Sequence, residues 1–167
     1  YFGAAPDSDL DSIALRDVVY RVVLPASRAD ELSSAQWETI AQQPWIVAPA
    51  PSSHYQLVMS LFGDGTARPE RIVEADSESV INELVEAGVG VSLIRDEIAA
   101  HSVEAGRSIV WPGREITTTL WLVHPANRRT DPLIAALRDV QQEIWSDAGG
   151  AVHDSPEPVA AVAGADR

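Results

Sequence analysis

The chain has 167 residues, enough for one domain with a core or for two small lobes, and 46% of them are hydrophobic. It carries 25 acidic and 12 basic residues, and the resulting net charge of -13 repels nucleic acid backbones. The chain contains no cysteine, which excludes disulfides, iron–sulfur clusters and thiol catalysis and agrees with a reducing, cytoplasmic location.

The sequence shows neither a membrane span nor an export signal. No apolar run reaches the about 20 residues that cross a bilayer, so we expect no membrane span. No basic segment followed by an apolar run opens the chain, so we expect no export signal. The first residue is Tyr1 and not Met, and we therefore expect further sequence upstream in a longer parent protein.

The first third of the chain predicts a strand, a short helix and a second strand. Residues 18–24 form a β-branched run that a proline closes, which is typical of a buried strand. Ser33 and Ser34 are placed to cap a short helix that ends before residue 44. Residues 45–48 form the next apolar run, and prolines close this second expected strand.

A longer helix and a third strand are expected next. Ser52 and Ser53 can cap a helix that extends to about residue 62, since apolar residues recur there at helical spacing. Glycines end this helix, and the apolar run at residues 71–75 predicts a strand.

The following segment predicts a capped amphipathic helix and a fourth strand. Asp76 and Ser77 can cap a helix whose apolar stripe includes Ile81, Leu84 and Val85. Gly88 is placed to take the left-handed conformation that ends many helices. Residues 89–94 then form a strand.

The last elements complete an alternation of strands and helices. Residues 96–102 predict a short helix, residues 108–111 and 117–123 predict two strands, and residues 132–145 predict a final helix. The remaining residues, 147–167, show no periodicity and are expected to be disordered. The alternation predicts an α/β fold with a mostly parallel sheet flanked by helices.

The segment Glu78–Ile94 resembles the effector-binding domain of LysR-type transcriptional regulators. In that family a helix ending Leu-Val-x-x-Gly leads into a strand of the form Gly-x-Gly-x-small-Leu. The matching positions here are Leu84, Val85, Gly88, Gly90, Ser92 and Leu93. Residues 22–25, 44–47, 59–69 and 120–123 agree with further segments of the family in order and spacing, so the resemblance covers residues 3–145.

The resemblance implies a two-lobed fold like that of periplasmic binding proteins. Residues 1–16 would then be a crossover segment entering from lobe one, and residues 17–117 a nearly complete, effector-binding lobe two. Residues 118–146 would be the return strand and helix of lobe one, which is present only in part, and residues 147–167 the disordered tail. The DNA-binding helix-turn-helix would lie upstream, outside this chain.

Two junctions between strand and helix are candidate ligand sites. In open α/β sheets ligands bind beyond the carboxyl ends of strands, where the chain enters helices. Ser52, Ser53 and His54 stand at one such junction, where backbone N–H groups and the helix dipole favour an anion and the hydroxyls add donors. The resemblance implies that this turn contacts the effector, whereas a cap that serves its own helix is the plain alternative.

Ser77 stands at the second junction and is a further candidate ligand-binding residue. Its neighbour Asp76 already places a carboxylate there, which opposes an anionic ligand and favours a capping role for this pair.

Other motifs point to neither catalysis nor a cofactor. Serines next to His54 on a helix diverge by about 100°, so they do not form a nucleophile–base pair, and no Gly-x-Ser-x-Gly motif is present. Glu97 and His101 lie four residues apart, which fits half a metal site or, as the preferred interpretation, a solvated pair. The glycines of Gly88-x-Gly90 precede a strand, the reverse of a dinucleotide-binding order.

The function expected from the resemblance is ligand sensing without catalysis. A small molecule, a carboxylate by the argument above, would bind between two lobes and control transcription through the parent protein, a homo-oligomer of two or four subunits. DNA would be bound only by the upstream helices, and no cofactor or metal is expected. The alternative is a solute-binding component of a transporter with the same two lobes, and an enzyme would need a buried titrating pair that the sequence does not show.

Overall fold

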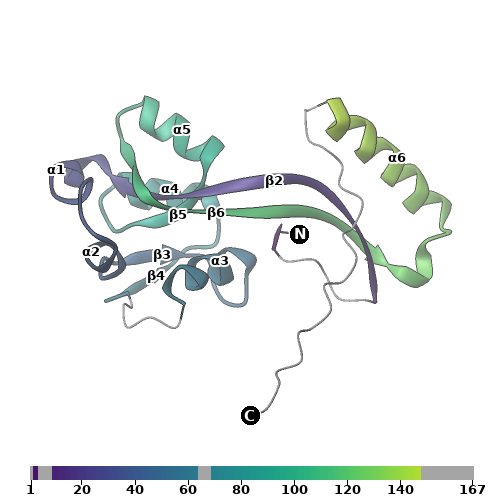
Figure 1. Ribbon diagram of the computed structural model, residues 1–167, viewed down its shortest axis with the longest axis horizontal. Helices are drawn as coiled ribbons and strands as arrows, with labels where there is room; N and C mark the ends of the chain where they lie inside the picture. The colour runs from purple at the N-terminus through teal and green to yellow at the C-terminus, as the bar shows by residue number, and fades with distance from the viewer. Residues whose placement is uncertain (1, 4–8, 64–68, 148–167) are drawn as a thin grey trace, which may run out of the picture. The chain divides into compact units, whose positions relative to one another are not determined.

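The computed structural model describes residues 2–3, 9–63 and 69–147 of the chain. The helices and strands, apart from β1, are labelled in Figure 1. In chain order they are β1 (Phe2–Gly3), β2 (Leu10–Pro25), α1 (Ala29–Leu32), α2 (Trp37–Ala41), β3 (Trp45–Val47), α3 (Ser53–Phe62), β4 (Ile72–Glu74), α4 (Glu78–Glu86), β5 (Ser92–Arg95), α5 (Asp96–Glu104), β6 (Ser108–Pro125) and α6 (Pro132–Asp147).

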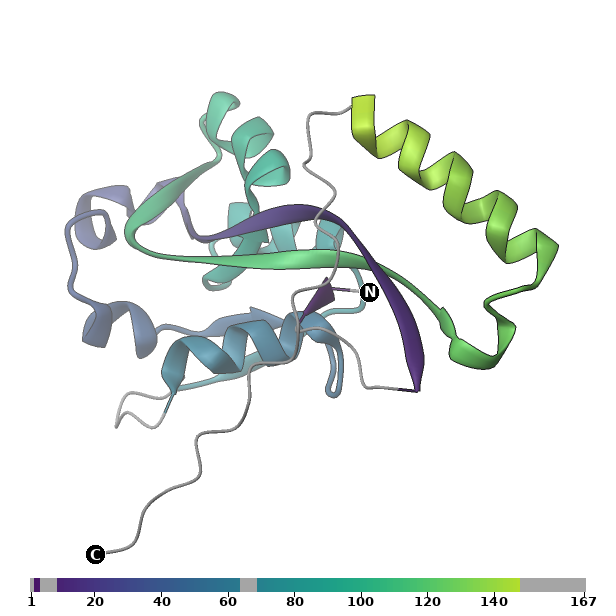
Figure 2. The same cartoon turned by 45° about the vertical axis from the view of Figure 1, so that its right-hand side comes forward.

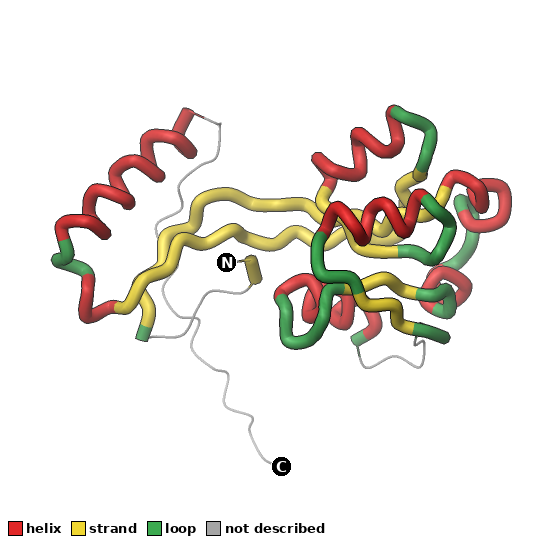
Figure 3. Tube along the Cα trace, turned by 180° about the vertical axis from the view of Figure 1, so that it is seen from behind, coloured by secondary structure: helices red, strands yellow, loops and turns green. Residues whose placement is uncertain are grey.

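The chain folds into two compact units. The larger unit holds Asp17–Thr118 together with Phe2, and the smaller unit holds the described residues of Gly3–Arg16 and Thr119–Arg167. The long strands β2 and β6 are hydrogen-bonded neighbours in one sheet and run side by side, as Figures 1 and 3 show. Each of these two strands contributes residues to both units, so the chain passes between the units within strands and not within loops.

The sheets confirm the α/β class and contain both kinds of strand pairing. The four-stranded sheet has the order β1-β6-β2-β5, and β2 pairs antiparallel with β5. The two-stranded sheet pairs β3 with β4 in parallel, with Trp45 opposite Ile72. A parallel bridge between Trp45 and Val91 connects β3 to the residue just before β5. The parallel strands predicted from the alternation are thus β3, β4 and β5, while β2 gives the sheet its mixed character.

The core of the larger unit lies between these strands and the helices α4 and α5. One cluster of buried residues in this core comprises Val23, Ile46, Ala75, Ile81, Val85, Ile94 and Ala99. Leu84 packs against this cluster, so the predicted stripe of α4 is a core-facing stripe. Burial of a side chain such as Ile81 contributes about 1.5–3 kcal/mol to folding.

The glycines after α4 behave as the sequence predicts. Gly88 has φ of 80°, in the left-handed region that ends helices. A Cβ at Gly90 would lie 2.3 Å from the backbone oxygen of Pro44, so only glycine allows the chain to approach this closely. The approach is the one that lets Val91 donate a hydrogen bond to the Pro44 carbonyl and pair with β3.

The prediction of two separate strands at residues 108–111 and 117–123 is wrong. A single strand, β6, runs from Ser108 to Pro125 and includes Pro112 and Gly113. A Cβ at Gly113 would lie 2.0 Å from the indole of Trp111. Gly113 is therefore required because a tryptophan ring occupies the space of its side chain, and not because the chain turns.

The expected cap at Ser33 and Ser34 is also wrong. The helix α2 begins after Gln36, whose extended backbone (φ -74°, ψ 161°) supplies the N-cap without a side-chain hydrogen bond. Ser33 instead ends the preceding helix α1, which the sequence did not reveal as a separate element. The final helix α6 is present as predicted and includes Asp147, while residues 148–167 of the predicted tail lie outside the described residues.

Candidate functional site

The carboxyl ends of β3, β4 and β5 meet at one edge of the larger unit. Because β3 pairs in parallel with β4 and bridges in parallel to the start of β5, the three strands point the same way. Each of them leads into a helix: β3 into α3, β4 into α4 and β5 into α5. Figure 2 shows α3 lying along these strands. We call the starts of α3, α4 and α5 the helix-start edge, and this is where ligands bind in open α/β sheets.

The start of α3 carries a serine cap and no acidic residue. Ser52 is the N-cap, and its Oγ accepts a hydrogen bond of 3.2 Å from the backbone N–H of Tyr55. Ser52 and Ser53 are both half-buried. The first turn of α3 contains no Asp or Glu, so the positive end of its dipole is not compensated from within the helix. This start is therefore suited to an anionic group.

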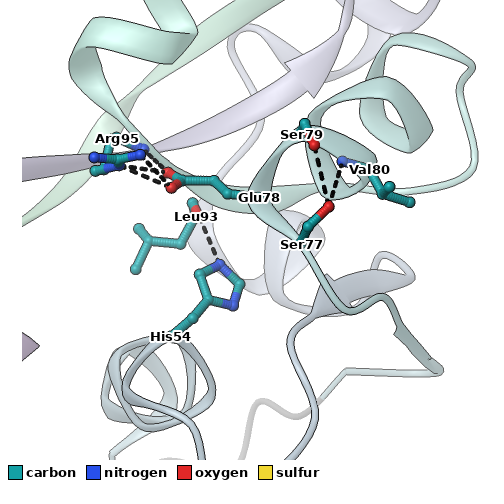
Figure 4. A network of polar contacts seen from close by, with 7 residues as sticks. All are labelled: His54, Ser77, Glu78, Ser79, Val80, Leu93 and Arg95. Atoms are coloured by element: carbon teal, nitrogen blue, oxygen red, sulfur yellow. Dashed lines mark hydrogen bonds and ion pairs between the residues drawn. The ribbon is translucent and has the colours of Figure 1, made fainter.

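His54 is held by two backbone groups. The Ala48 N–H donates a hydrogen bond of 3.1 Å to Nδ1, so Nδ1 is unprotonated and the ring hydrogen is assigned to Nε2. Nε2 lies 2.8 Å from the buried Leu93 carbonyl and donates to it (Figure 4). Burial lowers the pKa of His54 below its usual value of 6.5, more than the Leu93 carbonyl and Glu78 raise it. His54 is thus a neutral link between α3, the end of β3 and β5.

The start of α4 has the same cap but a different charge. Ser77 is the N-cap, and its Oγ accepts from the Val80 N–H at 3.4 Å and lies 3.1 Å from the Ser79 hydroxyl. Ser77 and Asp76 are exposed. Glu78 occupies the first turn, so this helix start carries its own carboxylate. Of the Asp76–Ser77 pair predicted to cap the helix, Ser77 is the residue that does so.

Glu78 forms an ion pair with Arg95 that the sequence did not reveal. Arg95 Nε lies 3.0 and 2.8 Å from the two carboxylate oxygens of Glu78, and its NH2 group lies 2.7 Å from Oε2 (Figure 4). Both side chains are partly buried, with 29% and 23% of their surfaces exposed. The pair joins the end of β5 to the start of α4. It also raises the pKa of Arg95, mainly through the hydrogen bonds to Glu78.

Tyr20 lies next to this pair in the antiparallel ladder, opposite Arg95. Burial, and then the charge of Glu78, raise the pKa of its phenol to about 12, so Tyr20 remains protonated at neutral pH. A further ion pair joins Arg21 to Asp96 at the start of α5, with Nε and Oδ1 2.6 Å apart. Acidic residues thus occupy the first turns of α4 and α5 but not that of α3.

The structure therefore brings the four predicted site residues to one edge, at two different helix starts. Ser52, Ser53 and His54 lie at the start of α3, and Ser77 lies at the start of α4. Their contact with a ligand stays a prediction. Glu78 and Arg95 were missed because the strand-end rule was applied to β3 and β4 but not to β5, whose last residue is Arg95.

The geometry around His54 does not form a nucleophile–base pair with its serine neighbours. Both ring nitrogens are bound to backbone groups, and the Ser52 hydroxyl accepts from a backbone N–H. His101 Nδ1 lies 2.7 Å from the Glu97 backbone carbonyl. Within residues 2–3, 9–63 and 69–147, no three His, Cys, Asp or Glu side chains gather as a metal site would require. No helix in the described part of the chain is long and apolar enough to cross a membrane.

The comparison with models of known protein families identifies one family. A family model described as the LysR substrate binding domain matches residues 1–145. No curated protein matches the sequence.

Three solved structures show the same fold at low sequence identity. The full-length LTTR LysG from Corynebacterium glutamicum, with bound effector Arg, is 18% identical with a TM-score of 0.65, covering 87% of this chain and 49% of that one. The CcmR regulatory domain of Synechocystis PCC6803, in complex with 2-PG, is 15% identical with a TM-score of 0.72, covering 88% and 73%. ArgP from Mycobacterium tuberculosis is 16% identical with a TM-score of 0.67, covering 86% and 49%. The chain thus spans about half the length of the full-length regulators.

Proposed function

This chain belongs to the LysR substrate binding domain family, and from that premise we propose that its α3 start binds a small carboxylate effector. The fold is the periplasmic-binding-protein-like α/β fold that this family shares. The family is one of regulatory ligand-binding domains, so the chain is the effector-binding part of a transcriptional regulator. The carboxylate, its site and the consequences for DNA binding are the proposal.

The observation that carries the proposal is the charge difference along the helix-start edge. The start of α3 has no acidic residue in its first turn, whereas α4 has Glu78 and α5 has Asp96 and Glu97. The α3 start is therefore the one left to attract an anion, whereas carboxylates already occupy the first turns of the other two helices. Ser53 and the first N–H groups of α3 supply donors there, and Ser77 borders the same edge from α4.

We infer that a ligand there acts by shifting a conformational equilibrium. A carboxylate that contacts both lobes of the complete domain would favour one hinge angle, and that angle would set the spacing of the upstream DNA-binding heads. The hinges would lie near residues 10–16 and 117–123, where the sequence predicts the crossings between lobes. Residues 1–16 would be the crossover segment from lobe one, residues 17–117 the effector-binding lobe two, and residues 118–146 the return strand and helix of lobe one. The parent protein would be a cytoplasmic dimer or tetramer.

Bound effectors in related structures support this proposal. LysG carries bound effector Arg, an amino acid with a carboxylate, and the CcmR regulatory domain is in complex with 2-PG. The regulator is retained over the transporter component because the family model and the structural neighbours are of regulators.

The test is a titration of carboxylates against the full-length parent protein, followed by thermal unfolding. A carboxylate that raises the unfolding temperature is then titrated against the double variant Ser52→Ala, Ser53→Ala and against Ser60→Ala as the matched control on the same helix. Ser60 donates to the Leu57 carbonyl and lies near the other end of α3. We expect at least tenfold weaker binding for the double variant only. Unchanged affinity in the double variant would refute the assignment of the site.

A further inference from the structure

The smaller unit contains a pocket of its own, separate from the helix-start edge. Its volume is about 410 Å³, and it is lined by residues 10–13, His124, Arg129 and Arg138. These residues come from the start of β2, the end of β6, the turn that follows β6 and the helix α6. All of them belong to the smaller unit, so the pocket is formed without any residue of the larger unit.

The charges in this pocket do not cancel. Arg129 forms an ion pair with Asp11, with Nε donating to Oδ2 at 2.7 Å, and this hydrogen bond lowers the pKa of Asp11. Those two charges compensate each other. Arg138 is half-buried and is a second guanidinium in the lining, and its charge also helps to lower the pKa of Asp11. One positive charge is therefore left over, in a chain whose net charge is -13.

The buried imidazole of His124 also lies in this pocket, and one of its nitrogen atoms has no hydrogen-bond partner among the described residues. His124 has only 8% of its side chain exposed, and Nδ1 lies 3.1 Å from the Pro125 carbonyl, to which it donates. Its Nε2 has no hydrogen-bond partner among the residues described and lies 3.9 Å from Asp11 Oδ2. A buried polar atom without a partner costs free energy, so such atoms in native proteins call for an explanation.

We propose that this pocket binds a small organic carboxylate. The guanidinium of Arg138 has donors in the fork geometry that matches a carboxylate, and the Ser12 hydroxyl is a further donor in the lining. Leu10 and Ile13 supply the smaller, apolar part of a lining that is mostly polar. The site is independent of the proposed α3 site, because the two share no residue and lie in different units.

The probe for this pocket is hexanoate, which has one carboxylate and a short apolar body. It is titrated into the full ¹⁵N-labelled chain while amide chemical shifts are followed. We expect shifts at residues 10–13 and 124–138 and saturable binding. Arg138→Gln should weaken that binding at least tenfold, since it removes a charge-assisted contact, and Ser12→Ala should weaken it about threefold. Arg71→Gln, the same charge change at an exposed position of the larger unit, should change it less than twofold.

Three results would overturn this proposal. Shifts confined to the larger unit would place hexanoate at the α3 start instead. Equal weakening by Arg138→Gln and Arg71→Gln would mean that only the overall charge matters. Inorganic phosphate binding as tightly as hexanoate would show that Leu10 and Ile13 contribute nothing. Circular dichroism of each variant confirms that it is folded, and Arg138→Lys, which keeps the charge but loses the fork, should recover part of the affinity.

Discussion

The helices α3 and α4 both begin with a serine N-cap, but their first turns carry different charges. In both helices a serine precedes the first turn and accepts a backbone hydrogen bond from the residue three positions later. The α3 start is half-buried, free of acidic residues and fixed by His54, whereas the α4 start is exposed and carries Glu78, paired with Arg95. A serine cap alone therefore does not predict ligand binding. The charges in the first turn, and the side chains that contact this turn, must also be known.

Among substitutions at the starts of α3 and α4, His54→Ala is expected to reduce the free energy of unfolding the most. The substitution removes the partners of the Ala48 N–H and of the buried Leu93 carbonyl, so we expect a loss of about 3 kcal/mol in the free energy of unfolding. Urea denaturation measures it. His101→Ala, at an exposed histidine bonded only within its own helix, is the control and should cost less than about 0.5 kcal/mol. Equal losses would mean that His54 does not fix the start of α3.

The pH dependence of stability tests the same link. Burial lowers the pKa of His54 in the folded chain below 6.5, so as pH falls through 6.5 the unfolded chain takes up a proton that the folded chain does not. Stability should therefore fall with decreasing pH, by at most about 1.4 kcal/mol per pH unit, until the folded pKa is passed. The difference between the wild type and His54→Ala should narrow from pH 7.5 to pH 5.5. A constant or widening difference would contradict a neutral His54.

The two capping serines should contribute similar amounts to the stability of the protein, but only Ser52 should contribute to ligand binding. We expect Ser52→Ala to cost about 1 kcal/mol and Ser77→Ala somewhat less, because the Ser77 cap is longer and exposed. Chemical denaturation gives both values. A carboxylate found to stabilise the parent protein should lose most affinity in the Ser52 variant. If the Ser77 variant lost as much, the charge difference between the two starts would not direct the anion.

The smallest effect is expected from Glu78→Gln. The Glu78–Arg95 pair is partly exposed, so solvent screening limits its contribution and we expect a loss of at most about 1 kcal/mol. The loss should shrink as salt is added. Glu83→Gln, an exposed acid on the same helix, is the matched control and should change stability little. A loss in Glu83→Gln as large as in Glu78→Gln would show that the pair contributes nothing specific.

The sequence predicted the local elements of the larger unit well, because their signals are local. Ser52 and Ser77 are both caps, Gly88 ends α4 in the left-handed region, and Ile81 with Val85 faces the core. Each of these depends on neighbours within a few residues, which is the range over which periodicity and capping patterns act.

The features that the sequence did not reveal depend on residues far apart in the chain. His54 bonds to Leu93, 39 positions away, and Arg95 pairs with Glu78, 17 positions away, and neither spacing follows from a helix or strand period. The contact between the Trp111 ring and Gly113 likewise follows from the packing of β6 and not from a sequence period. The pocket around Arg138 joins β2, β6 and α6, which only the fold brings together.

The two backbone bonds of His54 have a consequence for the cost of recognition. The second residue of α3 is attached both to the segment that precedes the helix and to a neighbouring strand, so the first turn is already ordered before any molecule arrives. Little of the free energy of binding an anion is then lost in ordering the turn, so that even a few hydrogen bonds can yield measurable affinity.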